Sequence, residues 1–148
     1  MSSLITAISH VPYRVKDLDE SIEFYTKLLG FQLVRRWKMD GRESAYLGLG
    51  GVLLEMSGGG NAADFPDGRP GGRRLGLAVS DLDAVIADLT GKGVKIGYEP
   101  YEARTFWGRQ GGIVEPSGFV ISLRQWREPD NPSFEGWQPN SEGVERTG

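Results

Sequence analysis

A pattern of eight residues occurs twice in this 148-residue chain, and this internal repeat constrains the fold more than any other feature. The first copy covers residues 15–22 (VKDLDESI), and the second begins 64 residues later and covers residues 79–86 (VSDLDAVI). Val, Asp, Leu, Asp and Ile recur in register. A repeat of this length indicates two supersecondary units that complete each other's core.

Each copy also contains the start of an amphipathic helix. Asp17 and Glu20 form an N-cap signal, because an Asp side chain can accept a hydrogen bond from an exposed amide of the first turn. The apolar residues behind it recur at helical spacings of three and four, at Leu18, Ile22, Tyr25, Leu28 and Leu29. Gly30 provides a stop. In the second copy, Asp81 begins a helix with the same pattern at Leu82, Val85, Ile86 and Leu89, which ends at Gly91 and Gly93.

Strand-like runs separated by turn signals follow each helix. They cover residues 31–38, 44–49 and 52–56 in the first unit and 94–98, 105–115 and 119–126 in the second. A further strand-like segment precedes each helix, over residues 5–15 and 73–79. The sequence therefore predicts an α+β protein built from two βαβββ modules.

We expect a single domain over residues 1–126, because a chain that is 39% hydrophobic can bury its own core at this length. Module 1 covers about residues 4–57 and module 2 about 73–126. Residues 58–72 are rich in Gly and Pro and are predicted to form a mobile linker. Residues 127–148 are predicted to form an extended tail without a core of its own.

Composition excludes several classes of function. The formal net charge is -3, so the chain lacks the basic surface that nucleic-acid binding needs. The absence of Cys excludes disulfides, thiolate zinc sites and cysteine nucleophiles. No apolar run approaches the roughly 20 residues that span a membrane. The first residues lack the pattern of a signal peptide, so we expect a cytoplasmic protein.

Several motifs together resemble a known superfamily. They are residues 10–19 (HVPYRVKDLD), 21–25 (SIEFY), 29–31 (LGF), 107–109 (WGR) and 115–118 (EPSG). In this combination the chain resembles the glyoxalase/bleomycin-resistance/dioxygenase superfamily, also called vicinal oxygen chelate proteins, over about residues 4–126. The resemblance implies curved mixed sheets around a cleft, a small organic ligand and a homodimer.

Metal-dependent members of this superfamily have four ligand positions, one on the first and one on the last strand of each module. The repeat offset aligns Arg74 with His10, and the turns at Gly51 and Gly118 align Ser122 with Glu55. Only His10 and Glu55 suit a first-row metal, because guanidinium has no lone pair and a hydroxyl is a weak ligand. A second cation at about 4 Å would add about 4 kcal/mol of repulsion per unit charge. We therefore predict no metal, the alternative being Mn, Fe, Ni or Zn at His10 and Glu55.

The remaining candidates are ligand-binding residues. Arg74 could pair with Glu55 in the place of an ion, or extend into solvent. Arg14 shares a face with His10 and could bind an anionic part of a ligand, as the resemblance to glyoxalase I implies, or form a cross-strand ion pair. Arg124 is a candidate of the same kind. Three aromatic residues could line a cleft for a flat organic ligand: Trp37, Tyr46 and Trp107.

Three functions compete. The first, which we predict, is a metal-free small-molecule-binding protein that resembles the antibiotic-sequestering bleomycin-resistance branch. The second is an enzyme: a metal-dependent lyase, isomerase or extradiol dioxygenase, or a metal-free catalyst that uses His10 and Glu55 as acid and base. The third is an accessory or regulatory domain. The sequence leaves open whether any catalysis occurs, and a single His is often structural.

Overall fold

The structure is a computed structural model that describes residues 4, 6–59, 75–127, 142–145 and 147. The chain divides into two compact units, Met1–Gly72 with Pro116–Gly118, and Arg73–Glu115 with Phe119–Gly148. Most of the expected linker and most of the expected tail lie outside the described residues.

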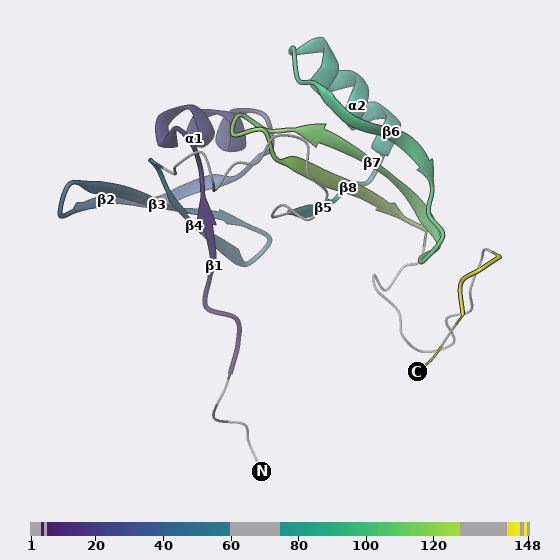
Figure 1. Ribbon diagram of the computed structural model, residues 1–148, viewed down its shortest axis with the longest axis horizontal. Helices are drawn as coiled ribbons and strands as arrows, with labels where there is room; N and C mark the ends of the chain where they lie inside the picture. Colours follow the sequence, from purple (N-terminus) through teal and green to yellow (C-terminus); the bar gives the residue numbers. More distant parts are fainter. Residues whose placement is uncertain (1–3, 5, 60–74, 128–141, 146, 148) are drawn as a thin grey trace. The chain divides into compact units, whose positions relative to one another are not determined.

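The first unit contains one helix and four strands. They are β1 (Val11–Arg14), α1 (Leu18–Lys27), β2 (Gln32–Met39), β3 (Arg42–Leu49) and β4 (Val52–Ser57). The strands form one sheet in the order β1-β4-β3-β2, in which β1 is parallel to β4 and the other pairs are antiparallel. Helix α1 lies along one face of this sheet (Figure 1). Within the described residues of this unit, no helix or strand covers the opposite face, which is called the open face below.

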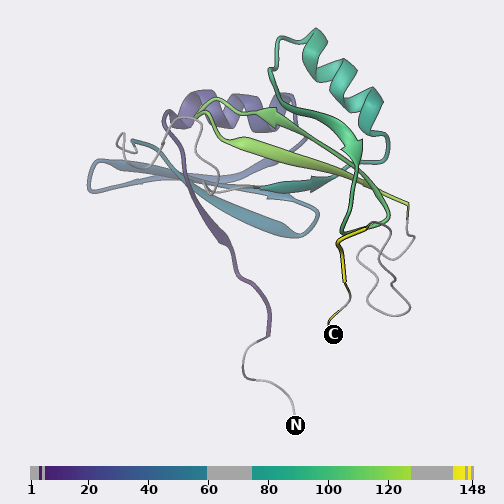
Figure 2. The same ribbon diagram turned by 45° about the vertical axis from the view of Figure 1, so that its right-hand side comes forward.

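The second unit repeats this arrangement. Its elements are β5 (Gly76–Ala78), α2 (Leu82–Gly91), β6 (Ile96–Glu102), β7 (Gly108–Val114) and β8 (Val120–Trp126). The sheet order is β5-β8-β7-β6, and α2 lies along one face (Figure 2). The predicted α+β class with two βαβββ modules is confirmed. Among the described residues, no helix has the length and apolarity needed to cross a membrane.

The predicted helix caps form in both modules. The Asp17 side chain accepts a hydrogen bond from the Glu20 amide at 2.9 Å, and the Asp81 side chain accepts one from the Ala84 amide at 3.1 Å. Gly30 and Gly93 follow the helices with φ of 79° and 86°, a conformation that favours glycine. Local sequence chemistry therefore fixes where each helix begins and where the chain turns back to its sheet.

Each module has an apolar layer between its helix and its sheet. In the first module the buried residues include Tyr13, Leu18, Tyr25, Leu47, Leu54 and Met56; in the second they include Leu82, Leu89, Ile113, Ile121 and Leu123. Because side chains alternate along a strand, the residue between two buried neighbours faces the opposite side. Glu55 lies between Leu54 and Met56, so it faces the open side of the first sheet. Ser122 faces the open side of the second sheet for the same reason.

Several strand boundaries differ from the sequence prediction. The strand expected over residues 5–15 is formed only by β1, which begins at Val11. The strand expected over residues 105–115 begins only at Gly108, because the chain turns before it and the Ala103 amide donates to the Gly108 carbonyl at 2.9 Å. Strand β6 continues through Pro100 to Glu102. This is possible because β6 is an edge strand, where the missing N–H of proline costs no ladder hydrogen bond.

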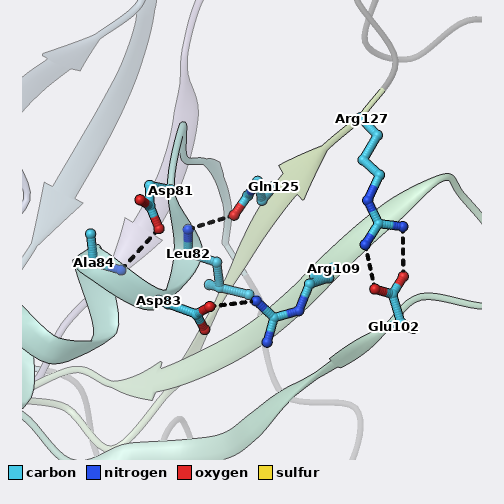
Figure 3. Close-up of polar contacts among 8 residues, drawn as sticks. All are labelled: Asp81, Leu82, Asp83, Ala84, Glu102, Arg109, Gln125 and Arg127. Carbon is cyan, nitrogen blue, oxygen red and sulfur yellow. Dashed lines mark hydrogen bonds and ion pairs between the residues drawn. The ribbon is translucent and has the colours of Figure 1, made fainter.

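Two hydrogen bonds attach helix α2 to its sheet (Figure 3). Arg109 donates to the Asp83 carboxylate at 2.8 Å, and the Leu82 amide donates to the Gln125 side-chain oxygen at 2.7 Å. Gly108 approaches the neighbouring strand so closely that a Cβ atom there would lie 2.2 Å from the carbonyl oxygen of Gln125. The Gly108 and Arg109 positions of the WGR motif thus have clear structural roles.

Candidate functional site

The open face of the first sheet holds the predicted acid/base pair. Nε2 of His10 lies 3.1 Å from Oε2 of Glu55, and the two side chains are 36% and 32% exposed. Nδ1 of His10 lies 3.0 Å from the Ser9 hydroxyl. The β1–β4 register, in which Pro12 is opposite Glu55, brings the segment before β1 alongside β4. The two residues are therefore close enough to exchange a proton.

Aromatic side chains border this pair. Tyr46 is opposite Glu55 in the β3–β4 register, and its ring meets the His10 ring edge-on with the centroids 6.3 Å apart. The Trp37 ring centroid lies 4.8 Å from that of Tyr46. Four of the predicted site residues are thus gathered on one face of one module.

His10 and Glu55 are the two metal-donor side chains that the described residues bring together at the position where the resemblance implies a divalent metal. No group of three or more His, Cys, Asp or Glu residues able to hold a metal occurs within the described ranges. His10 and Glu55 offer two donor side chains, whereas zinc sites use at least three protein ligands even when a water completes the set. Arg74, the predicted replacement for a third ligand, lies outside the described residues.

The strand register of the second sheet shows which of its residues corresponds to Glu55. Gly76 is opposite Ser122 on its parallel neighbour, as Pro12 is opposite Glu55 in the first module. Gly112 is opposite Ser122 on its antiparallel neighbour, as Tyr46 is opposite Glu55. Ser122 therefore occupies the place of Glu55, as the sequence alignment assumed, and Gly112 occupies the place of Tyr46.

Gly112 has no side chain at the position where the first module has Tyr46, and this leaves room for the ring of Tyr98. A Cβ atom on Gly112 would lie 2.3 Å from the ring of Tyr98, so that ring rests directly on the glycine. The Tyr98 hydroxyl then shares a hydrogen bond of 2.9 Å with the Ser122 hydroxyl. The second module thus has two linked neutral hydroxyls where the first module has an imidazole next to a carboxylate.

Tyr98 and Ser122 line a pocket of ≈ 780 Å³ within the second unit. This volume is in the range of small-molecule sites. Strand β5 contributes the small residues Gly76 and Ala78, and a Cβ atom on Gly76 would meet no atom within 4 Å. The polar groups of the lining are Tyr98, Tyr101, Gln110, Ser122 and Arg124, and Trp126 adds an aromatic surface. The pocket combines space, aromatic rings and a few polar groups.

The other predicted site residues are more scattered. Arg14 is half-buried in β1. Trp107 is 43% exposed in the turn before β7 and does not line the pocket. Ser122 and Arg124 do line it, together with residues that were not among the site predictions: Tyr98, Tyr101, Gln110 and Trp126. The sequence signal for the Tyr98 side of the pocket is the glycine at position 112, and its meaning depends on strand register.

Comparison with known proteins gives one family and several relatives. The model of the Glyoxalase/Bleomycin resistance protein/Dioxygenase superfamily matches residues 7–123. A probable lactoylglutathione lyase of Vibrio cholerae serotype O1 is 31% identical over 126 residues, which are 80% of this chain and 89% of that protein. A lactoylglutathione lyase of Arabidopsis thaliana is 28% identical over 132 residues, which are 85% of this chain and 42% of that protein. The chain thus spans less than half of the plant relative.

A solved structure adds a relative of another kind. The antibiotic-binding protein TnmS3 from a Streptomyces species superposes with a TM-score of 0.62 and is 27% identical. The superposition covers 84% of this chain and 98% of that protein. The chain is thus similar both to proteins named as lyases and to a protein named for binding.

Proposed function

Because this chain belongs to the Glyoxalase/Bleomycin resistance protein/Dioxygenase superfamily, we propose that it binds a small, flat organic molecule without a metal. The proposed site is the pocket on the open face of β5–β8. The similarity to the antibiotic-binding TnmS3 supports a binding role. The homodimer and the cytoplasmic location stay predictions from the sequence.

The observation that carries this proposal is the pair of hydroxyls at Tyr98 and Ser122. Ser122 stands where the repeat places a carboxylate in the first module, and its neutral oxygen is already hydrogen-bonded to a second neutral oxygen. Such a pair is a poor metal ligand but a good donor and acceptor for a polar organic group. The same pair lies in a pocket with enough room and aromatic surface for a ring.

A glyoxalase-like enzyme is the second candidate. The relatives named lactoylglutathione lyase favour it, and so does the 3.1 Å contact between His10 and Glu55, which is suitable for acid/base chemistry. Against the metal-dependent form, the described part of the chain brings together two donor side chains at this place, fewer than the three protein ligands of a catalytic zinc site. The metal-free form requires a substrate that reaches the open face of the first sheet.

Metal analysis separates the metal-free proposal from the metal-dependent enzyme. We expect the chain, purified without chelator or affinity tag, to contain far less than one metal ion per chain. Addition of Mn, Fe, Co, Ni or Zn should leave the melting temperature unchanged, although a metal at 100 times its Kd would stabilise the folded state by about 2.7 kcal/mol. Lactoylglutathione lyase activity should be absent with every metal.

His10→Ala provides the control for this experiment. A melting shift that arises from adventitious metal binding elsewhere will persist in this variant, and a shift that depends on the His10–Glu55 pair will disappear. One bound metal per chain, stabilisation that His10→Ala removes, and lyase activity would together reject the metal-free proposal.

A further inference from the structure

Arg124 has an unusual environment within the proposed pocket. It lies on β8 two residues after Ser122, so both side chains face the same side of the sheet. Its guanidinium carbon is 4.7 Å from the ring centroid of Phe106 and 5.9 Å from that of Trp126. The faces of these rings attract the guanidinium, but the ring contacts use none of the five N–H donors of Arg124. Arg124 is therefore held in place without having its hydrogen bonds satisfied by the rings.

No carboxylate of the described residues neutralises Arg124. Three other arginines do contact carboxylates: Arg36 contacts Asp19 and Glu43, Arg109 contacts Asp83, and Arg127 contacts Glu102. The residues that line the pocket include no Asp, Glu, Lys or His. Among the described residues, the pocket therefore carries one positive charge that no carboxylate offsets, in a chain whose net charge is -3.

The surroundings of Arg124 suit an anion on an aromatic ring. A half-buried guanidinium loses part of its hydration, and an anionic ligand would restore the lost interactions. The planar fork of arginine matches the two oxygens of a carboxylate. Gln110 is opposite Arg124 in the strand register, and its side-chain amide donates to the Tyr101 hydroxyl, which places further polar groups beside the charge.

We propose that this pocket selects aromatic molecules that carry a carboxylate, and that Arg124 binds the carboxylate while the neighbouring rings pack against the ligand's ring. This inference rests on the proposed function. It narrows the ligand from a flat organic molecule to an aromatic carboxylate.

A matched pair of probes tests this selectivity. The probes are 2-naphthoate and 2-naphthamide, which share their ring system and differ in charge. Isothermal titration of the full chain should give a lower Kd for 2-naphthoate. In Arg124→Met, which keeps a long apolar side chain and removes the charge, 2-naphthoate should bind about 10- to 100-fold more weakly, because a charged hydrogen-bonding partner is lost. The affinity for 2-naphthamide should remain within a few-fold.

Two further variants serve as controls. Arg109→Met removes an arginine from the same sheet whose charge is already paired with Asp83, and it should leave both affinities unchanged. Arg124→Lys keeps the charge and should retain part of the preference for 2-naphthoate. A wild-type chain that binds both probes equally, or an Arg124→Met chain with unchanged affinity for 2-naphthoate, would overturn the inference and leave the proposed function standing. Failure to bind either probe at millimolar concentration would overturn both.

Discussion

Gly76→Leu is expected to weaken the binding of 2-naphthoate by roughly 100-fold, which corresponds to about 2.7 kcal/mol. Gly76 lines the pocket, and an added Cβ atom would enter space in which no protein atom lies within 4 Å. The variant can therefore keep the native sheet, but its leucine side chain fills the volume that a ligand's ring would occupy. We expect the loss of binding free energy to be similar to the loss of stability when a core is overpacked. Titration calorimetry measures the loss.

The matched control for this variant is Ala87→Leu. It adds a leucine to the same module at an exposed position of α2, outside the residues that line the pocket. We expect it to change neither the affinity nor the melting temperature appreciably. If Gly76→Leu folds normally and binds 2-naphthoate as tightly as the wild type, the ligand does not use this pocket.

Gly108→Ala is expected to lower the free energy of unfolding by about 3 kcal/mol, the upper end of the range for overpacking. The new Cβ atom would lie 2.2 Å from the Gln125 carbonyl oxygen and 2.8 Å from the Phe106 ring. A ring can turn away, but a backbone oxygen cannot move unless β7 and β8 separate. For a chain of this size the loss corresponds to a fall in melting temperature of roughly 10 °C.

Gly91→Ala is the matched control for Gly108→Ala. Gly91 is the last residue of α2, and a Cβ atom there would meet nothing within 4 Å. Alanine is a better helix former than glycine, so this variant should be as stable as the wild type or slightly more stable. Equal melting temperatures for the Gly108→Ala and wild-type chains would mean that β7 and β8 are not packed as closely as described.

Much of the fold could be predicted because its signals are local. Asp17 and Asp81 act as helix caps wherever they precede a helical pattern, and both do so in the structure. The 64-residue offset aligned the first strands, and the turns at Gly51 and Gly118 aligned the last strands. The ligand positions implied by the resemblance to the superfamily then paired His10 with Glu55 before their 3.1 Å contact was known. Strand alternation is reliable wherever a strand is regular.

Sequence reasoning identified Ser122 and Arg124 of the second module's pocket but not its tyrosines, because β6 is not regular. Its register with β7 shifts between Ile96 and Tyr98 and again between Tyr98 and Tyr101. Simple alternation would place two tyrosines three positions apart on opposite faces, yet both line the same pocket and their ring centroids lie 6.0 Å apart. A bulge changes which face a side chain occupies, and the sequence does not reveal one.

The two modules illustrate how a duplicated unit can acquire different chemistry while its packing is maintained. The buried positions on either side of Glu55 and of Ser122 are apolar in both copies. The open faces differ, with an imidazole and a carboxylate on the first sheet and two hydroxyls with a guanidinium on the second. Packing restricts which residues can occupy the helix-facing positions. The positions on the open faces are not restricted in this way, so their residues can differ according to the ligand.

Amide chemical-shift mapping by NMR tests the location and the metal independence of the site together. The labelled chain is titrated with 2-naphthoate in the presence of a chelator. The expected result is a saturable shift of the amides of Gly76, Ala78, Ser122 and Arg124, which lie opposite one another on β5 and β8. Shifts that appear only after the chelator is replaced by a divalent metal, and that centre on His10 and Glu55, would contradict metal-free binding in the second module.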